Sequence, residues 1–542
     1  MSGTPLSPLE VLRLYPPHGD TLPGLLASRA RTAPRRPFLT DGSRTLDWID
    51  AAARVGKLAA GLAGRGVGPG ARVAVVSRNR IETVLLAFAV AQVRAMLVPL
   101  NPELTEGETA HLIAHCEPSV ILASEEVLDA VLGAARRAAV SARLFCFEGA
   151  RAGADDFAQL EADTHATEAA ARPEDTAFLL YTSGTTGAPK GVLHSQRSFV
   201  LAGEGFVERM HLEPEDRMLC VLPFFHINAL FYSLAGAAAA GATLIVAPRF
   251  SASDFWRFAA RTQATQVNII AAVGNILALR PQAELVPHAI RKLYGAPISP
   301  RLHELLRGRF GIPVAIEGYG MTEIPGAINN PWEGPQVPGS MGRAARHPDP
   351  RREFVRLRVL DEDGRECAPG QPGELWVKTP LLMQGYWRDP EAAAAAVRDG
   401  WFRTGDLVRR EAGGWYYFVA RIRDIIRRRG ENVSGAELDA VIGSHPAILE
   451  AAAIGVPAEL GEEEILVAAV LRPGARLDAG ELVQWCAARL AAHKRPRYVA
   501  FVEALPHTPT HRVAKHRLKS DPGLMRRAVD LGAIEPRDPP PR

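Results

Sequence analysis

The stretch YTSGTTGAPKGV, residues 181–192, gathers the residue types that a phosphate-binding loop needs. Glycines let the backbone approach a bulky anion, hydroxyls add short donors, and a lysine adds a point charge. These residues are Thr182, Ser183, Gly184, Thr185, Thr186, Gly187, Lys190 and Gly191. The stretch is not a Walker A loop, because Pro189 precedes the lysine and Gly191 follows it. A flexible surface loop rich in glycine and threonine is the alternative.

The apolar run AFLLY, residues 177–181, predicts a buried strand, so that the loop leaves the end of a sheet. Helical and strand-like segments alternate on both sides of it, which is typical of βαβ units and a largely parallel sheet. The predicted strands are 71–76, 95–100, 119–124, 216–223, 267–273 and 313–320, and the predicted helices are 47–64, 81–93, 105–115 and 300–309. A hairpin that turns at Asp41-Gly42 is expected within 37–50.

The pattern changes twice after residue 320. Short strands with glycine and proline turns predict a β-rich subdomain at about 335–420. The segments that follow are enough for a small α+β domain, with helices at 435–443 and 478–491 and strands at 449–455, 464–471 and 498–503. We therefore predict an α/β protein with a large N-terminal domain over 1–420, an α+β domain over 421–534 and a disordered tail at 535–542.

Composition excludes several classes of function. The chain has 542 residues, enough for more than one domain, and its net charge of +3 gives no argument for a nucleic-acid partner. Five scattered cysteines without a CxxC pair indicate reduced thiols, and no signal peptide is evident, so we expect a cytoplasmic protein. The uncharged segment 229–248 is long enough to span a bilayer, but Gly241 divides it. A buried helix followed by a strand is the preferred interpretation.

The segment GYGMTE, residues 318–323, carries residues suited to phosphate chemistry. Thr322 can donate a hydrogen bond to a phosphate, and Glu323 offers the hard oxygen that Mg²⁺ takes beside nucleotide phosphates. A glycine turn with a solvated glutamate is the plain alternative.

Three other features have two interpretations each. Asp406, in WFRTGDL, can accept hydrogen bonds from two ribose hydroxyls or be an ordinary turn aspartate. His226, in the apolar segment PFFHINAL, is either functional or a hydrogen-bonded core residue. The basic run at 421–429 is either a binding surface or a solvated charged face.

Together these motifs say more than each does alone. YTSGTTGAPKG, GYGMTE, TGD and RIRDIIRRRGENVS follow one another between residues 181 and 434. This arrangement resembles the adenylate-forming superfamily, which includes acyl- and aryl-CoA synthetases, luciferases and the adenylation domains of peptide synthetases. The resemblance covers the chain from about residue 20 to 520, and PFFHINAL, GYGMTEIPG and RRGENVS are most similar to acyl-CoA ligases of the crotonobetaine/carnitine-CoA and fatty-acid-CoA group.

The resemblance implies a reaction in two steps. A carboxylate attacks the α-phosphate of ATP to give an acyl-AMP, and the thiol of coenzyme A then displaces AMP, while a mobile C-terminal domain rotates between the steps. In-line attack needs positioning and charge neutralisation more than a protein nucleophile. The cofactors expected are therefore ATP, Mg²⁺ and coenzyme A as co-substrate.

The same resemblance implies roles for individual residues. Residues 182–190 would wrap the β- and γ-phosphates of ATP. The other implied roles are adenine binding by Gly295, Ala296, Pro297 and Tyr319; α-phosphate binding by Thr322; Mg²⁺ binding by Glu323 with Thr182; ribose binding by Asp406 and Arg421; a hinge at Arg423; the pantetheine tunnel at Gly430; and a gate between acyl pocket and thiol at His226.

The chain departs from the family pattern near its C-terminus. The family usually reads P-x-x-x-x-G-K there, with a lysine that bridges the carboxylate and the α-phosphate, but LPHTPTHRVAKHRL has His511 and Arg512 instead. Arg512 keeps the charge, although its planar group is not interchangeable with an ammonium. Lys515 lies three residues on and is the other candidate, and weak adenylation is a third outcome.

The sequence thus predicts an ATP-dependent acid–CoA ligase, with two rivals. One rival is an adenylating enzyme that loads a carrier protein, and the other is a nucleotide- or acyl-binding homologue that has lost catalysis. The expected partners are a small carboxylic acid, ATP and coenzyme A, and a homodimer is one option for assembly. The acyl pocket is expected around 225–230, 273–277 and 324–328, which are mainly apolar and favour an apolar acyl group.

Overall fold

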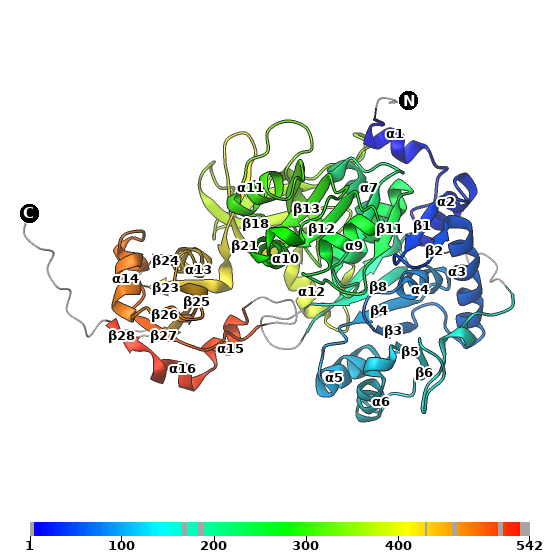
Figure 1. The fold of residues 1–542 in the computed structure, drawn as a ribbon, viewed down its shortest axis with the longest axis horizontal. Coiled ribbons are helices and arrows are strands. Elements are labelled where there is room, and N and C mark those ends of the chain that lie inside the picture. Colours follow the sequence, from blue (N-terminus) through cyan, green and yellow to red (C-terminus); the bar gives the residue numbers. More distant parts are fainter. Residues whose placement is uncertain are drawn as a thin grey trace, which may run out of the picture. The chain divides into compact units, whose positions relative to one another are not determined.

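A computed structural model describes residues 5–164, 171–182, 189–428, 431–457, 463–507 and 513–531, and of residues 423, 431 and 432 it describes the backbone. The chain forms two compact units, each described by itself below (Figure 1). Of the described residues, those up to 357 and those at 377–402 belong to unit one, and those at 358–376 and from 403 onward belong to unit two. The predicted α/β class is confirmed, whereas the domain boundary near residue 421 stays a prediction.

In the described part of unit one, a nine-stranded sheet has the order β16-β15-β14-β13-β12-β10-β11-β1-β2. The strands from β14 to β1 are parallel, and β15, β16 and β2 add antiparallel edges. The strands are β1 (Pro37–Thr40), β2 (Thr45–Asp47), β10 (Arg217–Cys220), β11 (Thr243–Val246), β12 (Gln266–Ile270), β13 (Lys292–Ala296), β14 (Val314–Met321), β15 (Ile324–Asn329) and β16 (Arg343–Ala344). The predicted hairpin is formed by β1 and β2. The strand predicted at 267–273 is wrong beyond Ile270, where helix α10 begins, because an apolar run without alternation fits a helix as well.

A second sheet of unit one carries the glycine-rich stretch. Its order over the described residues is β19-β9-β8-β4-β3-β5-β6-β7, parallel from β8 to β7 and antiparallel at β9 and β19. The strands are β3 (Arg72–Val76), β4 (Met96–Leu100), β5 (Val120–Ala123), β6 (Arg143–Cys146), β7 (Asp155–Asp156), β8 (Thr176–Tyr181), β9 (Gly191–Ser195) and β19 (Gly385–Tyr386). The stretch 182–190 therefore joins two neighbouring antiparallel strands, at the end of a buried strand as predicted.

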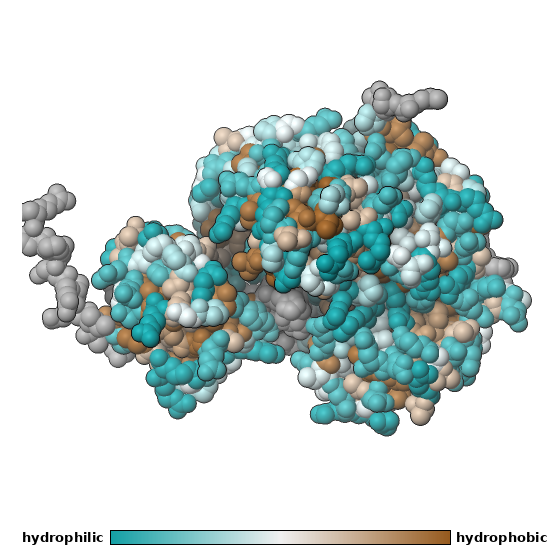
Figure 2. Space-filling view, viewed as in Figure 1, coloured by the Kyte–Doolittle hydropathy of each residue, from teal (hydrophilic) through white to brown (hydrophobic). Residues whose placement is uncertain are grey.

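Helices of unit one pack on these sheets. They are α1 (Pro8–Arg13), α2 (Leu22–Thr32), α3 (Trp48–Ala63), α4 (Ile81–Gln92), α5 (Glu106–Cys116), α6 (Leu128–Arg137), α7 (Gln196–Met210), α8 (Ala235–Ala240), α9 (Phe255–Arg261), α10 (Ala271–Leu279), α11 (Pro300–Gly308) and α12 (Pro390–Ala396). Every residue of α8 and β11 is buried, which confirms the predicted helix–strand unit within 229–248, although a π-helix over Asn228–Leu234 precedes α8. Among the described helices, none is long and apolar enough to cross a membrane. Hydrophilic residues cover most of the face viewed in Figure 2, and apolar residues occur there in small groups.

A buried arginine on helix α2 caps the C-terminal end of helix α8. Arg29 is 1% exposed, and its guanidinium donates to the carbonyls of Ala238 at 3.0 Å and Ala239 at 2.6 Å. The hydroxyl of Tyr15 donates to the carbonyl of Ala240 at 3.1 Å, and its ring lies 4.1 Å from the guanidinium carbon. The last carbonyls of a helix have no partner within the helix, so these side chains satisfy groups that would otherwise be buried unpaired.

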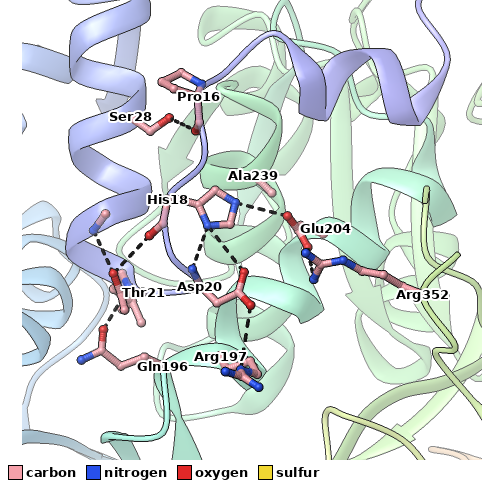
Figure 3. Close-up of polar contacts among 12 residues, drawn as sticks. Pro16, His18, Asp20, Thr21, Ser28, Gln196, Arg197, Glu204, Ala239 and Arg352 are labelled. Atoms are coloured by element: carbon pink, nitrogen blue, oxygen red, sulfur yellow. Dashed lines mark hydrogen bonds and ion pairs between the residues drawn. The ribbon is translucent and has the colours of Figure 1, made fainter. Parts of the chain in front are cut away.

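A buried glutamate connects helix α7 to two loops (Figure 3). Glu204 is 5% exposed and accepts from Nε2 of His18 at 3.2 Å and from Nε2 of His347 at 2.9 Å. The guanidinium of Arg352 lies 3.9 Å from the carboxylate. Burial raises the pKa of this carboxyl, but the two histidine hydrogen bonds outweigh burial and bring the pKa of Glu204 down to about 2.

The backbone fixes which nitrogen of each histidine carries the proton. Nδ1 of His18 accepts from the N–H of Asp20 at 3.2 Å, and Nδ1 of His347 accepts from the N–H of Asp349 at 2.9 Å. A nitrogen that accepts carries no proton, so each ring donates to Glu204 through Nε2. Glu204 therefore holds both loops as an ionised carboxylate that accepts one hydrogen bond from each histidine.

Unit two has a four-stranded sheet of order β25-β26-β27-β28 and a strand pair β23-β24 among its described residues. A further sheet has the order β17-β18-β21-β20 with β22 on β21, and the division between the units passes through β17, β18 and β21. The strands are β17 (Arg356–Leu360), β18 (Pro372–Lys378), β20 (Val397–Arg398), β21 (Trp401–Arg410), β22 (Tyr416–Arg421), β23 (Ile425–Arg428), β24 (Glu431–Ser434), β25 (Ile448–Pro457), β26 (Glu463–Leu471), β27 (Tyr498–Phe501) and β28 (Val529–Asp530). The helices are α13 (Gly435–Gly443), α14 (Ala479–Ala487), α15 (Lys515–Lys519) and α16 (Pro522–Arg527). The predicted β-rich and α+β segments are confirmed as secondary structure.

Candidate active site

The β8–β9 hairpin frames the glycine-rich stretch. The N–H of Thr182 donates to the carbonyl of Lys190 at 2.9 Å, and the Thr182 hydroxyl lies 3.4 Å from the same oxygen. The predicted phosphate ligands Ser183, Gly184, Thr185, Thr186 and Gly187 lie outside the described residues. The two ends of the stretch, Thr182 and Lys190, are thus held together where β8 ends and β9 begins.

The turn at Thr322 and Glu323 joins strands β14 and β15. Glu323 is 8% exposed, its carbonyl accepts from the N–H of Met383 at 2.9 Å, and its carboxylate accepts from the Tyr386 hydroxyl at 2.8 Å. Burial raises the pKa of Tyr386, so that its phenol stays protonated and donates. The ammonium of Lys190 lies 4.8 Å from the centroid of the same tyrosine ring. Tyr386 therefore brings together Lys190 and Glu323, which the sequence predicted to act on one group of phosphates.

The sequence analysis missed Tyr386. Its local sequence, MQGYWRD, has no motif, and it reaches Glu323 only because β19 pairs with β9 in antiparallel register, with Tyr386 opposite Val192. A contact across 63 residues of chain leaves no local signal in one sequence.

The predicted adenine-binding residues lie on the nine-stranded sheet. Gly295 and Ala296 end β13, a cis peptide joins Ala296 to Pro297, and Tyr319 lies half-buried on the adjacent β14. Gly318 must lack a side chain, because a Cβ there would lie 2.4 Å from the hydroxyl of Tyr294. The structure places these residues on neighbouring strands, and their role toward adenine stays a prediction.

A second residue missed by the sequence analysis is Glu317, next to these strands. It is 9% exposed, and burial raises its pKa to about 7, opposed by hydrogen bonds from the N–H groups of Ile298 and Gly339. Ile298 directly follows the predicted adenine segment, so a carboxyl that titrates near neutral pH supports that loop. A glutamate in a strand commonly points to solvent, so the sequence alone gives no sign that Glu317 is buried.

His226 lies at the start of a helical segment. Its N–H donates to the carbonyl of Pro223 at 3.0 Å, and its ring centroid lies 4.5 Å from that of Phe225. The π-helix Asn228–Leu234 follows two residues later, and π-helical segments are frequent at functional sites. The half-buried position fits either a gate or a core residue, so the gate stays a prediction.

Unit two brings Asp406 and Arg421 together. They are directly opposite each other on β21 and β22, and Nε of Arg421 lies 3.1 Å from Oδ1 of Asp406, which is 1% exposed. The pairing makes a fixed carboxylate–guanidinium pair that can offer both an acceptor and a donor to vicinal hydroxyls. The proposed hinge residue Arg423 lies in a short 3-10 turn, Ile422–Asp424, after β22. The predicted ribose and hinge roles stay predictions.

The two candidates for the adenylation cation differ in what the structure describes. Lys515 is 16% exposed and its ammonium lies 2.6 Å from Oδ2 of Asp439, whose Oδ1 accepts from the N–H of Ala453 at 2.6 Å. Burial raises the pKa of Asp439, and the charge of Lys515 opposes that rise. Arg512 lies outside the described residues, as does Gly430. Lys515 is thus engaged within unit two by a half-buried ion pair.

The site fits Mg²⁺ by its donors. Among the described residues, no group of three or more His, Cys, Asp or Glu side chains could hold a metal. Mg²⁺ does not need such a cage, because one or two carboxylates plus substrate phosphates commonly bind it. The nearly buried carboxylate of Glu323, which accepts its one described hydrogen bond from a neutral phenol, is a suitable ligand.

Comparison with known proteins gives consistent results. The family described as AMP-binding enzyme matches residues 26–387, and that described as AMP-binding enzyme C-terminal domain matches residues 437–512. The sulfoacetate–CoA ligase of Cupriavidus necator is 33% identical over 518 residues, which is 93% of this chain and 99% of that protein. The long-chain-fatty-acid–CoA ligase FadD13 of Mycobacterium tuberculosis is 31% identical, over 91% of this chain and 97% of its own. The crystal structure of ATP-bound MatB from Rhodopseudomonas palustris matches with a TM-score of 0.82 at 27% identity, covering 92% of this chain and 98% of MatB.

Proposed function

The chain belongs to the family of AMP-binding enzymes and is an AMP-forming acid–CoA ligase, and from this premise we propose how its residues divide the reaction. The observation that carries the proposal is the convergence of Lys190 and Glu323 on Tyr386. Two motifs more than 100 residues apart in sequence meet there in one unit.

The first half-reaction uses the residues of unit one. The stretch 182–190 holds the β- and γ-phosphates of ATP, and Thr322 donates to the α-phosphate. Glu323, with the hydroxyl of Thr182, holds Mg²⁺, which neutralises phosphate charge when bound. The acid's carboxylate then attacks the α-phosphorus in line, and pyrophosphate leaves, so that these residues act by orientation and charge.

The cation that bridges the carboxylate and the α-phosphate is Arg512. Supporting this choice, Lys515 already forms a half-buried ion pair with Asp439, and moving Lys515 away would leave that half-buried carboxylate without its cation. Arginine also keeps its charge at every working pH and can bind two oxygens at once.

The second half-reaction transfers the acyl group to coenzyme A. The thiolate of coenzyme A attacks the acyl carbon of the acyl-AMP, and AMP leaves with the electrons of the broken C–O bond. Asp406 and Arg421 hold the ribose, His226 gates the thiol's entry, Gly430 lines the tunnel, and unit two turns about Arg423 between the steps. The position of Arg423 in a short turn between two strands supports a hinge there.

The acyl group is apolar. Val273, Leu277, Ile324 and Ala327 are buried apolar residues in the segments that we assign to the acyl pocket. The relatives act on acids as different as sulfoacetate and long-chain fatty acids, so the choice depends on this lining rather than on likeness. The protein works in the cytoplasm, a proposal supported by its five cysteines, all free and buried.

AMP release measured with and without coenzyme A, over a panel of acetate, octanoate, palmitate, phenylacetate and sulfoacetate, tests the proposal. The ligase releases AMP only when both an acid and coenzyme A are present, and apolar acids exceed sulfoacetate. Pyrophosphate exchange without a thioester to free coenzyme A would favour the carrier-loading enzyme, and neither activity would favour the impaired homologue. Light scattering on the same preparation distinguishes a monomer from a homodimer.

A further inference from the structure

A buried histidine joins the two motifs through a backbone atom. Nε2 of His194, on β9, lies 2.6 Å from the carbonyl oxygen of Thr322. His194 is 0% exposed and lies four residues after Lys190.

The partners of His194 determine its protonation. A carbonyl oxygen can only accept, so Nε2 must carry the hydrogen. Burial lowers the pKa of His194 to about 4, opposed by that hydrogen bond, so the ring is neutral at physiological pH and Nδ1 is bare. Nδ1 lies 3.2 Å from the hydroxyl oxygen of Ser198, and that hydroxyl donates its one hydrogen to the carbonyl of Ser195 at 2.9 Å. His194 is therefore a neutral donor with one fixed tautomer.

Aromatic packing fixes the ring in place. The ring centroid of His194 lies 4.7 Å from that of Phe231, which is itself fully buried. Phe231 packs against Phe178 at 5.6 Å and Phe199 at 5.5 Å between ring centroids. A ring enclosed in this way has no room to turn away from Thr322, because protein interiors are close-packed.

The hydrogen bond crosses between two sheets. Lys190 leads into β9 of the eight-stranded sheet, whereas Thr322 lies between β14 and β15 of the nine-stranded sheet; labels β8 and β13 mark these sheets in Figure 1. No backbone ladder joins the two sheets within the described residues, and apolar packing between them has no direction of its own. Only directional contacts can fix the distance between Lys190 and the Thr322–Glu323 turn.

Three such contacts come from β9 and from the chain paired with it. They are the His194 bond to the carbonyl of Thr322, the bond from the Met383 N–H to the carbonyl of Glu323, and the bond from the Tyr386 hydroxyl to the carboxylate of Glu323. The pairing of β19 with β9, with Tyr386 opposite Val192, places the second and third. The His194 bond is the one of these three that comes from a side chain of β9 and holds the main chain at Thr322.

We propose that His194 is a positioning residue for adenylation, which holds the Thr322–Glu323 turn in register with the strand that follows Lys190. This inference rests on the proposed function, in which these residues bind the phosphates and Mg²⁺. It predicts that losing the Nε2 donor mainly lowers the rate of acyl-AMP formation. ATP affinity should change little, because many other donors bind the phosphates, whereas misplacement by about 1 Å can lower a rate about 100-fold.

The test compares glutamine with asparagine at this position. In His194→Gln the amide nitrogen reaches the place of Nε2 and can donate to Thr322, whereas in His194→Asn the same amide is too short. ATP–pyrophosphate exchange, with the best acid of the panel, should keep at least a third of the wild-type kcat in His194→Gln and fall 10- to 100-fold in His194→Asn. ATP binding by calorimetry should stay within about threefold in both, as expected of an alignment effect. His194→Leu, which has no donor, should behave like His194→Asn if it folds.

Two controls separate position from damage. Ser198→Ala removes the Nδ1 partner and the hydrogen bond to the Ser195 carbonyl but keeps the Nε2 bond to Thr322, so it should exchange pyrophosphate like the wild type. Thioester formation from pre-made acyl-AMP should fall much less than pyrophosphate exchange in every variant, because that step no longer uses the β- and γ-phosphates and keeps only the Thr322 contact to the α-phosphate. Equal rates of pyrophosphate exchange in His194→Gln and His194→Asn, or an equal loss in both half-reactions, would overturn the inference. The proposed ligase function would be unaffected by either result. Absence of exchange in the wild type would instead overturn the proposed function, and the inference with it.

Discussion

Replacing Glu204 with glutamine should loosen the loops at His18 and His347 without changing the size of the buried side chain. The wild-type carboxylate accepts from both histidines. A glutamine offers one oxygen and one NH₂, so one histidine N–H would face a donor. That histidine could turn its tautomer only by losing the backbone N–H that its Nδ1 accepts from.

The magnitude follows from the carboxyl's pKa. A pKa near 2 rather than the ordinary 4.5 means that the folded protein favours the anion of Glu204 by about 3 kcal/mol, at about 1.4 kcal/mol per pKa unit. Loss of hydrogen bonds to a charged group, at about 1.5–3 kcal/mol each, gives a similar figure. Because the folded pKa is lowered, this stability is present above pH 4.5 and is lost as the pH falls toward 2.

Hydrogen exchange measures the stability of each loop separately. This suits a chain of two units that need not unfold together. At pH 7, amides in peptides covering 14–22 and 345–352 should exchange on the order of 100 times faster in Glu204→Gln, as about 3 kcal/mol requires. The advantage of the wild type should shrink as the pH falls from 4.5 toward 2. Glu208→Gln is the matched control: it lies one turn further along α7, and burial leaves its pKa raised, whereas hydrogen bonds leave that of Glu204 lowered. Equal protection in the wild type and Glu204→Gln, or equal losses in both variants, would refute this reasoning.

Three further outcomes are expected. Glu317→Gln should raise the melting temperature above that of the wild type at pH 8 but not at pH 5, because a folded pKa of about 7 means that the wild type loses stability as the pH rises from 4.5 through 7, by up to about 3 kcal/mol. Arg512→Ala should lower pyrophosphate exchange by orders of magnitude and spare thioester formation from pre-made acyl-AMP, whereas Lys515→Ala should mainly lower the stability of unit two. Arg29→Met should cost about 2–4 kcal/mol in urea unfolding, since it removes the donors to the carbonyls of Ala238 and Ala239, while Arg31→Met, at an exposed position of α2, should cost under about 0.5 kcal/mol.

Each of these has a contrary result. A Glu317→Gln difference that is the same at both pH values would mean that the carboxyl does not titrate near 7. A strong loss of pyrophosphate exchange in Lys515→Ala, with little loss in Arg512→Ala, would assign the adenylation cation to Lys515. Equal effects of Arg29→Met and Arg31→Met would mean that the buried guanidinium does not stabilise the helix end.

Local pattern was enough to predict most of the fold. The alternation of helices and strands and the hairpin at Asp41-Gly42 agree with the structure, because period and turn chemistry are properties of short segments. The run VNIIAAV was predicted as a strand throughout, but helix α10 begins after Ile270, since a buried strand and a buried helix both lack polar positions. The motifs also singled out Lys190 and Glu323, which the structure brings to the same tyrosine, and their roles toward phosphate and Mg²⁺ stay predictions.

The contacts that hold the site together could not be predicted from the sequence. Tyr386 and His194 act through partners 63 and 128 residues away in sequence. Glu317 depends on burial that only the assembled strands create. Such pairings follow from how two sheets are placed against each other, and one sequence carries no local record of that placement.

The burial of the five cysteines bears on how the two units can be studied. Burial raises the pKa of every one of these thiols, to about 12 at Cys116 and Cys220, so little thiolate is present at neutral pH to react with a maleimide. Fluorescent dyes attached to one introduced surface cysteine in each unit would therefore label those sites with little background from the native thiols. Energy transfer between the dyes, followed while ATP, an acid and coenzyme A are added in turn, would then report in real time whether unit two turns between the half-reactions.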